Sequence, residues 1–520
     1  GWPIAYSSCA AGTCSQTFEH GTLSANAIQW LYAATGSGSG TLGAATSVPG
    51  SVSGGAAQAF VNGWIYSSSA GTYAVYGAIQ ARYAQAGGPA GSLGWPTAGD
   101  VCVSGRCVQS FEHGSIAYAG AAGTFLLAGN IAEAYSASGG IAGSLGWPKA
   151  EAASVTGGQI QQFTNGAIYS SSHGTYPVFG AIQSKFSALG GPGSAVGWPV
   201  AADACGQSGW SCSQQFEGAR IFGVAGKAYP VSGAVQTFYL SAGGESGTLG
   251  WPAGDPRQIA GGISQAFDGG VLYASSAGTF LLSPAIASKY ESLAGPEGLL
   301  GWPTGSSASV TGGVAQEFAG GTIYTSSGGT VVAVAGPIRT LFISTGGLTG
   351  SLGWPTSDSA PAASGLRQTF SFGSIYSSSV GTFPVYGAIE SFYAGLGGPG
   401  GTLGWPTAGD ACGSGVCTQP FEHGTLVYTV ATGTVTNSAG GAFGAAQIQA
   451  LVASVGSTLG GSLSGVGAVA GGFSQPYQFA TVYSSSVGTF AVYGAIQSKY
   501  AELGGPGGTL GWPTAGDACG

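Results

Sequence analysis

The pattern of apolar and polar positions between residues 159 and 178 predicts three short strands. Residues 159–163 and 167–170 form the first two, because Asn165-Gly166 between them is the strongest two-residue signal for a hairpin turn. A Ser-Ser-x-Gly-Thr turn then leads into a third strand over 175–178. We therefore expect a small antiparallel β-meander.

A short helix is predicted to follow the meander, and the segment after residue 76 shows its signals best. Ile79 and Tyr83 lie at helical spacing, and Tyr76 precedes them as a hydrophobic staple on the first turn. Gly77 is the predicted N-cap, and Gly87-Gly88-Pro89 ends the helix with a left-handed C-cap and a residue that cannot continue it. The helix spans about ten residues, or roughly 15 Å. A helix this short depends on packing for its stability.

Gly-Trp-Pro recurs nine times in 520 residues and marks the period of this pattern. Most neighbouring tryptophans lie 51 to 53 residues apart, and two wider gaps each hold one degenerate copy, near Leu42-Gly43 and Leu459-Gly460. A fixed period of this length is typical of repeat proteins whose units bury apolar faces on one another. We therefore predict an α+β tandem repeat of about ten units of roughly 52 residues, each an antiparallel β-meander plus one short helix, stacked as a solenoid or propeller-like array.

The tryptophans also set the expected unit boundaries. Unit 1 is shortened, units 2 and 10 contain the degenerate linkers, and an eleventh unit begins at the end. The expected boundaries, in order, are 1–42, 43–93, 94–145, 146–196, 197–249, 250–300, 301–352, 353–403, 404–459, 460–510 and 511–520. Because the sequence starts and stops within a unit, we expect it to be a window cut from a longer chain.

Composition and charge narrow the class of protein. Charged residues make up only 6% of the chain, but 44% of residues are hydrophobic and 11% aromatic, so the chain can bury a core. With a net charge of -8 and 11 Lys plus Arg it has no basic stripe for nucleic acid. No apolar run is long enough for a transmembrane segment. The surface suits neutral partners such as glycans, or other copies of the chain.

Eight of the nine cysteines form close pairs that begin seven residues after a Gly-Trp-Pro tryptophan: Cys9/Cys14, Cys102/Cys107, Cys205/Cys212 and Cys412/Cys417. Half a zinc site is the alternative, but no histidine lies at ligand spacing, so we expect disulfides and neither a metal nor a cofactor. Units without cysteine carry Val-Thr-Gly-Gly at this place, so each bridge closes a hairpin that glycines already specify. Regular pairing implies an oxidising, extracellular setting.

The linkers carry a resemblance to a known family. Leu-Gly-Trp-Pro occurs in phase with the predicted hairpin and helix, at 93–96, 145–148, 249–252, 352–355, 403–406 and 510–513, with a Val196-Gly197 variant. The pattern resembles the LGFP repeat family, with Trp in place of the usual Phe, and the resemblance covers essentially the whole chain. It implies small α/β units in a secreted actinobacterial protein, often beside a hydrolase or mycoloyltransferase domain, that attaches to wall polysaccharide such as arabinogalactan.

Two residue types at the linkers are candidate carbohydrate-contacting or inter-repeat residues. Each tryptophan either offers a stacking platform to a sugar or seals neighbouring units, and sealing is the simpler explanation; these are Trp2, Trp95, Trp147, Trp198, Trp251, Trp302, Trp354, Trp405 and Trp512. An aspartate five residues later either hydrogen-bonds sugar hydroxyls or caps the turn before the first strand, and capping is favoured; these are Asp100, Asp203, Asp410 and Asp517.

Phe-Glu-His-Gly appears three times, at 18–21, 111–114 and 421–424. Glutamate beside histidine suggests acid-base chemistry, but the histidine is expected at the hairpin turn, as a tolerated substitute for the Asn or Gly that adopts a positive φ there. Adjacent strand residues also point to opposite faces. Since nucleophile-elbow, zinc-protease and Walker signatures are missing from the sequence, we expect no catalytic residues and no enzyme activity.

Cysteine pairs fall in units one, three, five and nine, so odd and even units are expected to meet different surroundings. We expect a non-catalytic extracellular repeat protein that attaches to the bacterial cell wall by multivalent polysaccharide binding. One alternative is a structural subunit of an extracellular filament or surface layer, in which copies of the chain are the partner. Another is the wall-binding tail of an enzyme.

Overall fold

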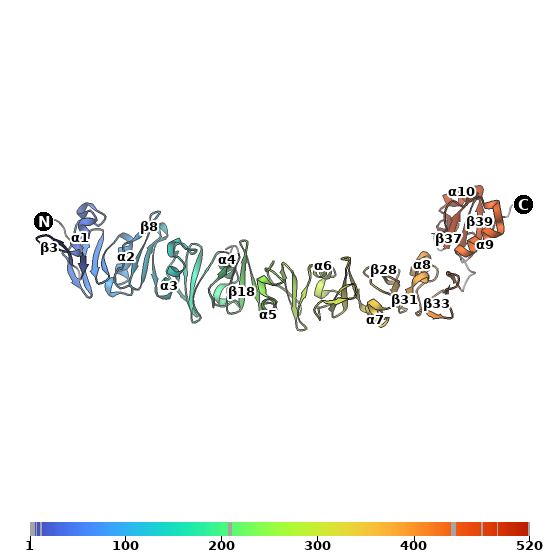
Figure 1. Cartoon of the computed structure of the whole chain (residues 1–520), viewed down its shortest axis with the longest axis horizontal. Coiled ribbons are helices and arrows are strands. Elements are labelled where there is room, and N and C mark those ends of the chain that lie inside the picture. The colour runs from blue at the N-terminus through green and yellow to red at the C-terminus, as the bar shows by residue number, and fades with distance from the viewer. Residues whose placement is uncertain are drawn as a thin grey trace. The chain divides into compact units, whose positions relative to one another are not determined.

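The computed structural model describes residues 6, 8–10, 13–205, 211–437, 444–469, 472–485 and 487–517. The chain divides into two compact parts, one made of residues 1–256 and 265–268 and the other of residues 257–264 and 269–520. Both parts consist of short antiparallel sheets, each followed by a short helix (Figure 1). The tandem α+β repeat predicted from the sequence is confirmed.

Ten short α-helices lie in the described part of the chain: α1 (Ala27–Ala34), α2 (Gly77–Gln85), α3 (Gly129–Ala137), α4 (Gly180–Ala188), α5 (Gly233–Ser241), α6 (Pro284–Ser292), α7 (Gly336–Ser344), α8 (Gly387–Gly395), α9 (Ala445–Val455) and α10 (Gly494–Glu502). None of these described helices has the length and apolar character that crossing a bilayer requires.

The fourth unit shows the sheet that recurs. Its strands are β12 (Ala153–Val155), β13 (Gly158–Gln162), β14 (Gly166–Ser171) and β15 (Gly174–Phe179), paired antiparallel in chain order. The last three match the predicted meander. The first is a fourth strand beyond the three predicted: Gly157, with a φ of +88°, lets the chain turn tightly enough for Val155 to pair with Gly158.

The corresponding strands follow the same order along the chain. They are β1 (Ser8–Ala10), β2 (Thr13–Phe18), β3 (Gly21–Asn26), β4 (Gly50–Val52), β5 (Gly55–Phe60), β6 (Gly63–Ser68), β7 (Gly71–Tyr76), β8 (Val101–Val103), β9 (Arg106–Phe111), β10 (Gly114–Tyr118), β11 (Thr124–Ala128), β16 (Ala204–Cys205), β17 (Ser211–Gln215), β18 (Ala219–Val224), β19 (Lys227–Ser232), β20 (Arg257–Ile259), β21 (Gly262–Phe267), β22 (Gly270–Ser275), β23 (Gly278–Leu282), β24 (Ala308–Val310), β25 (Gly313–Phe318), β26 (Gly321–Ser326), β27 (Val331–Ala335), β28 (Ala360–Ala362), β29 (Gly365–Phe370), β30 (Gly373–Ser377), β31 (Thr382–Tyr386), β32 (Ala411–Gly413), β33 (Val416–Phe421), β34 (Gly424–Thr429), β35 (Thr434–Asn437), β36 (Gly467–Val469), β37 (Gly472–Pro476), β38 (Ala480–Ser485) and β39 (Gly488–Tyr493).

The helix ends largely follow the sequence prediction. α2 stops at Gln85, and Gly87 beyond it adopts the predicted left-handed conformation, with a φ of +93°. Its start lies one residue earlier than predicted, because Tyr76 is the N-cap and Gly77 is the first helical residue. Gly77 has a φ of +60°, which explains why glycine stands there.

The hydrophobic core lies at the junctions between consecutive units. At the junction around α2, Tyr66 and Val75 of one sheet and Tyr83 of the helix pack with Phe111 and Ile116 of the next sheet. The ring centroids of Tyr83 and Phe111 are 4.5 Å apart. Burying each such side chain contributes about 1.5–3 kcal/mol. A unit therefore completes its core with residues of its neighbour.

A helix tyrosine also bonds the linker that follows it. The Tyr83 hydroxyl donates to the carbonyl oxygen of Gly94 at 2.6 Å, and burial raises the pKa of Tyr83. The same bond joins Tyr135 to Gly146, Tyr239 to Gly250, Tyr290 to Gly301, Tyr393 to Gly404 and Tyr500 to Gly511. The linker glycine is thus held at a fixed distance from the helix axis.

In five units of the described chain, a buried glutamine clamps the unit to the one before it. The Nε2 of Gln161 donates to the carbonyl of Leu126 in the preceding sheet and to that of Ala150 in its own linker, both at 3.0 Å. Glutamines at the same position make the same two bonds: Gln109, Gln214, Gln265 and Gln368. Both amide hydrogens are used, so this position depends on glutamine.

Candidate functional site

The linker tryptophans lie at the unit junctions. Trp95 is 7% exposed, and its ring meets Tyr66 of the preceding sheet edge to face, with centroids 6.3 Å apart. The indole covers the glycine turn of that sheet so closely that a Cβ on Gly55 would lie 2.8 Å from the ring. These contacts place the ring within the core, where it seals two units rather than offering a face to a ligand.

The other linker tryptophans follow the same plan with different exposure. Trp198 and Trp405 are buried like Trp95, and the half-buried ones are Trp147, Trp251, Trp302, Trp354 and Trp512. At Trp147 the preceding sheet has Ala117 in place of that tyrosine, and the guanidinium of Arg106 lies 5.8 Å from the ring centroid. Trp2 lies outside the described residues.

An acidic residue next to the hairpin tip fixes the backbone of the tryptophan. Glu112 Oε2 accepts the Trp95 N–H at 2.9 Å, and the same bond joins Glu217 to Trp198, Asp268 to Trp251 and Glu422 to Trp405. The glutamates of the second and third copies of Phe-Glu-His-Gly, Glu112 and Glu422, therefore each hold a linker backbone. The first copy, at residues 18–21, has side chains partly outside the described set.

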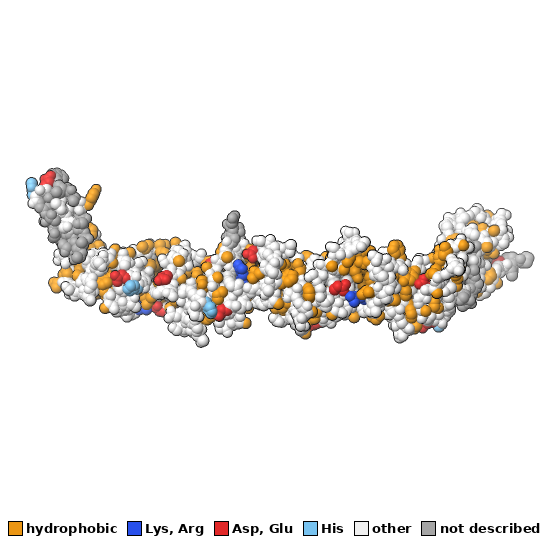
Figure 2. All heavy atoms as spheres, turned by 60° about the horizontal axis from the view of Figure 1, so that its bottom comes forward, with side chains coloured by type: hydrophobic (Ala, Val, Ile, Leu, Met, Phe, Trp, Pro, Cys, Tyr) orange, Lys and Arg blue, Asp and Glu red, His pale blue; other side chains and the backbone are white. Residues whose placement is uncertain are grey.

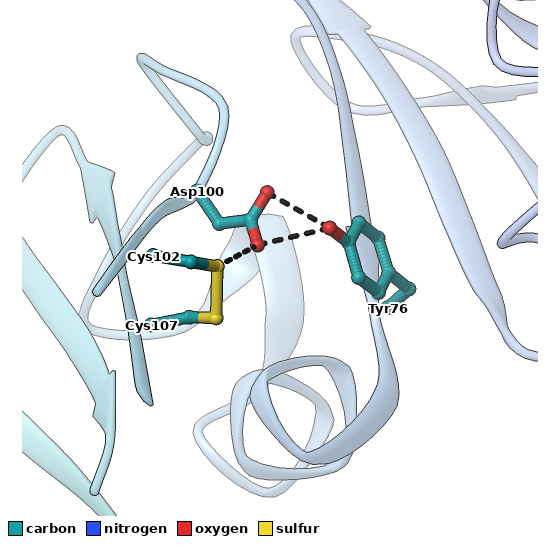
Figure 3. Close-up of a disulfide and its surroundings, with 4 residues drawn as sticks. All are labelled: Tyr76, Asp100, Cys102 and Cys107. Carbon is teal, nitrogen blue, oxygen red and sulfur yellow. Dashed lines mark hydrogen bonds between the residues drawn. A yellow bond between two sulfur atoms is a disulfide. The ribbon is translucent and has the colours of Figure 1, made fainter. Parts of the chain in front are cut away.

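The predicted aspartates lie beside the disulfides. Asp100 accepts a hydrogen bond from the Tyr76 hydroxyl at 2.9 and 3.0 Å to its two oxygens, and its Oδ2 lies 3.1 Å from Cys102 Sγ (Figure 3). Because Tyr76 belongs to the preceding sheet, this contact also crosses a junction. Burial raises the pKa of Asp203 and of Asp410, whereas Asp517 is exposed.

Three of the expected disulfides are present: Cys102–Cys107, Cys205–Cys212 and Cys412–Cys417. The strand register also places Cys9 opposite Cys14, although their side chains lie outside the described residues. Each of the three disulfides has an aspartate within 4.8 Å, as in a metal cluster. The sulfurs are bonded to each other, however, so they offer no thiolate to a metal ion.

A polar groove of about 730 Å³ lies between the β9–β10 hairpin and α3. We define it by its polar lining residues: Ser110, Glu112, His113, Ser115, Glu133 and Ser136. His113 does not adopt the positive φ expected of it. Gly114 does, at +149°, and glycine is required there because a Cβ would lie 2.2 Å from the Leu127 carbonyl oxygen. The conformation of Gly114 thus sets the position of His113, which lines the groove.

Exposed aromatic rings occupy the same hairpin tip in two other units. Phe372 and Phe479 stand where the third unit has His113, and they are 65% and 55% exposed. Their rings lie against the linker glycines, so that a Cβ on Gly353 would be 2.8 Å from Phe372. Sequence reasoning treated this position only as a turn. The signal that could have revealed these exposed rings was an aromatic residue at a position where other units have His, Asn or Gly.

Charged side chains are sparse on the surface. Figure 2 shows one face that is mostly neutral and hydrophobic, with isolated acidic, basic and histidine side chains.

The family model described as LGFP repeat matches residues 42–91, 93–143, 145–194, 249–298, 300–350 and 352–401, more than half of the chain. No curated protein sequence matches. Among solved structures, an extracellular domain of a one-component system from B. thetaiotaomicron is 9% identical over 91% of this chain and 68% of its own, with a TM-score of 0.10. PorZ, a surface component of the type-IX secretion system of Porphyromonas gingivalis, is 10% identical over 86% and 52%, with a TM-score of 0.12. These TM-scores are too low to establish a shared fold.

Proposed function

Because the chain belongs to the LGFP repeat family, we propose that it is a non-catalytic extracellular protein that binds bacterial cell-wall polysaccharide through several weak sites. The observation that carries the proposal is the polar groove, which gathers three serine hydroxyls, two carboxylates and an imidazole in one surface hollow. Groups of this kind donate to and accept from the hydroxyls of a neutral sugar. The sparse surface charge favours the same class of ligand.

The exposed rings of Phe372 and Phe479 supply the apolar half of such recognition. A sugar ring stacks its C–H face on an aromatic ring, and a ring held against backbone loses little freedom when it binds. Sites repeated along one chain raise the effective concentration of each other, so weak individual contacts sum to firm retention.

Two further observations support a binding role outside the cell. Glu112, the carboxylate next to His113, accepts the Trp95 N–H, which gives its position a structural reason. The three disulfides are consistent with an oxidising, extracellular setting.

The test is retention of the whole chain on delipidated cell wall and on soluble arabinogalactan. We expect retention of the native chain, at least a fivefold loss in a Phe372→Ala/Phe479→Ala variant, and a similar loss in a His113→Ala/Glu133→Gln variant. Val61→Ala is the matched control, because Val61 is 63% exposed at a hairpin tip but carries no ring. No retention of the native chain, or equal retention of all variants, contradicts the proposal.

A further inference from the structure

Three junctions in the described part of the chain carry an aspartate beside a disulfide, and at two of them tyrosines fill the space around it. At the first, Tyr76 bonds Asp100, and Tyr118 packs against the junction core together with Cys107. At the third, Tyr386 and Tyr428 hold the same two positions, and Tyr428 packs against the core together with Cys417. The pair of tyrosines is thus the usual filling of this type of junction.

The middle junction lacks both tyrosines. Phe179 stands at the position of Tyr76, at the end of the third long strand. Gly223 stands at the position of Tyr118, because Ile221 pairs with Gln214 as Ile116 pairs with Gln109, and both positions lie two residues beyond the isoleucine. One substitution removes a hydroxyl and the other removes a whole ring.

A cavity of about 240 Å³ opens where those groups are missing, and it is open to solvent on one side. Its lining residues include Phe179, Ile182, Asp203, Cys212, Gln214 and Gly223. Most of the surface that the lining presents to the cavity is apolar. An apolar protein cavity of roughly 150 Å³ accommodates a benzene ring. The space is therefore sufficient for one aromatic ring.

Asp203 gives the cavity its chemical preference. Its counterpart Asp100 is bonded by the Tyr76 hydroxyl, but Phe179 has no hydroxyl to offer. Asp203 accepts a hydrogen bond from its own backbone N–H, and its Oδ2 lies 3.1 Å from Cys205 Sγ, which cannot donate because it is in a disulfide. A carboxylate in an apolar wall favours a ligand that brings a hydrogen-bond donor to it.

We propose that this cavity is a binding site for a small aromatic ring that carries one hydrogen-bond donor, with phenol as the simplest example. Such a ligand restores the ring that Gly223 lacks and the hydroxyl that Phe179 lacks. A sugar fits the site less well, because its several hydroxyls face apolar walls that satisfy none of them. The site is independent of the polysaccharide binding proposed above.

Titration of the intact chain with p-cresol and with toluene, followed by calorimetry or ligand-observed NMR, tests the proposal. We expect one site for p-cresol and at least tenfold weaker binding of toluene, which has the ring but no donor. Asp203→Asn should weaken p-cresol severalfold and leave toluene unchanged. Equal affinity for the two ligands would overturn the role of Asp203.

Two transplants between junctions serve as matched variants. Phe179→Tyr/Gly223→Tyr copies the filling of the first junction and should abolish binding; a Cβ on Gly223 would lie 3.3 Å from Ile182 Cγ1, which requires only a small shift. Tyr76→Phe/Tyr118→Gly copies the middle junction and should raise the stoichiometry from one to two. Binding that survives the filling variant overturns the proposal. Trp210 lies outside the described residues, so binding seen only after Trp210→Ala means that the chain's own indole takes the cavity, which also overturns it.

Discussion

Lys185 on α4 forms an ion pair with Asp255, 70 residues further along the chain, with Nζ 2.8 Å from the carboxylate. Asp255 lies four residues after Trp251, in the second linker beyond α4, so the pair bypasses one complete unit. Arg82 and Glu151 repeat the arrangement at 2.9 Å. Lys289 forms the same kind of pair with Asp358. All three bases lie on helices of even units, which gives the two-unit alternation seen in the sequence a physical basis.

Neutralising this ion pair should lower the free energy of unfolding only slightly, and it should make that free energy less dependent on salt concentration. The pair is partly exposed, and such pairs contribute about 0–1 kcal/mol. We expect Lys185→Met and Asp255→Asn each to lower the free energy of unfolding by less than about 1 kcal/mol at low salt and by nearly nothing at 1 M NaCl. A double-mutant cycle by urea denaturation checks the coupling. Lys499→Met is the control, because Lys499 holds the same helix position but pairs with Glu502 on its own helix.

Replacing the buried glutamine should be far more costly. Gln161→Leu leaves the carbonyls of Leu126 and Ala150 without the donor that each has now. We expect a loss of about 2–4 kcal/mol in local stability, since a buried unsatisfied group costs about 1–3 kcal/mol. Hydrogen exchange of the amides in β11 and β13 measures it. The neighbouring Gln162 is exposed, so Gln162→Leu should leave exchange nearly unchanged; equal protection in both variants would contradict the assignment.

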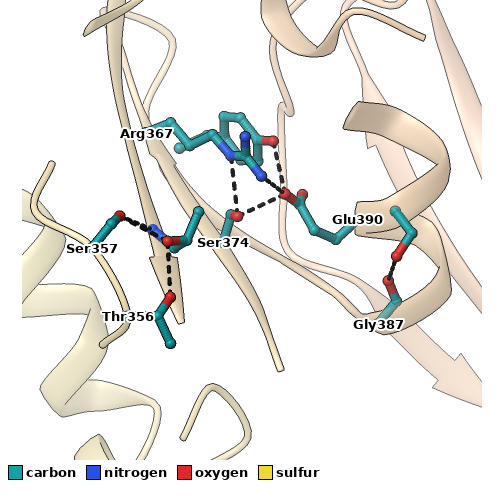
Figure 4. A network of polar contacts seen from close by, with 9 residues as sticks. Thr356, Ser357, Arg367, Ser374, Gly387 and Glu390 are labelled. Atoms are coloured by element: carbon teal, nitrogen blue, oxygen red, sulfur yellow. Dashed lines mark hydrogen bonds and ion pairs between the residues drawn. The ribbon is translucent and has the colours of Figure 1, made fainter. Parts of the chain in front are cut away.

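Glu390 should make the second part more stable as the pH falls from neutral. This side chain is 8% exposed, and its Oε1 accepts from Arg367 Nη2, Ser374 Oγ and the Tyr376 hydroxyl (Figure 4). Its Oε2 is buried without a partner among the described residues. Desolvation by burial raises the pKa of Glu390 above its ordinary value of 4.5.

The sign follows from proton linkage. The folded chain takes up the Glu390 proton at a higher pH than the unfolded chain, so stability rises as the pH falls through the raised pKa and gains nothing further below about 4.5. Glu390→Gln should remove this gain, because an amide does not take up a proton in this pH range. The substitution fits the fold, since α2 and α4 carry glutamine at the same helix position, Gln80 and Gln183. Urea denaturation of both proteins between pH 7 and pH 4.5 checks it. Parallel stability curves would show that Glu390 does not titrate in this range.

Removing a disulfide should weaken a unit without unfolding it. The Cys102–Cys107 bridge closes a hairpin that the fourth unit forms without cysteine, between Val155 and Gly158. Closing so short a loop contributes about 2 kcal/mol by chain entropy. We expect Cys102→Ala/Cys107→Ala to keep its circular dichroism spectrum and to lose about that much stability. Complete loss of exchange protection in β9 would mean that the bridge is required for folding.

Features that a few adjacent residues determine were predictable from the sequence. Asn165-Gly166 and Gly87-Gly88-Pro89 set a hairpin and a helix end because their backbone preferences are local, and the structure places both as predicted. The hairpin turn at Val155 to Gly158 was predicted from its glycines, but its first strand, β12, was not counted among the strands because three residues carry too little pattern to stand out. Gly77 was taken for an N-cap because glycine is common there, whereas its left-handed φ at the first helical position is the actual reason.

Contacts between units were not predictable in the same way. The two partners of Gln161 are backbone carbonyls, which leave no trace in a sequence. The glutamine itself did leave one, since Gln-x-Phe recurs in most units, as at Gln109 and Phe111. Tyr76 and Asp100, which form a hydrogen bond, are 24 residues apart in the sequence. The cavity at Asp203 could be recognised only once that hydrogen bond was known.

The glutamine clamp has a mechanical consequence. It ties a unit only to its predecessor and its own linker, so a chain under tension should release one junction at a time rather than rupture as a whole. Each unit of roughly 52 residues then unfolds and releases about 170 Å of extended chain. Where Lys185 reaches past a unit to Asp255, two successive releases become coupled. A chain anchored to a cell surface at several points would in this way absorb a sudden pull in steps and keep its remaining attachments.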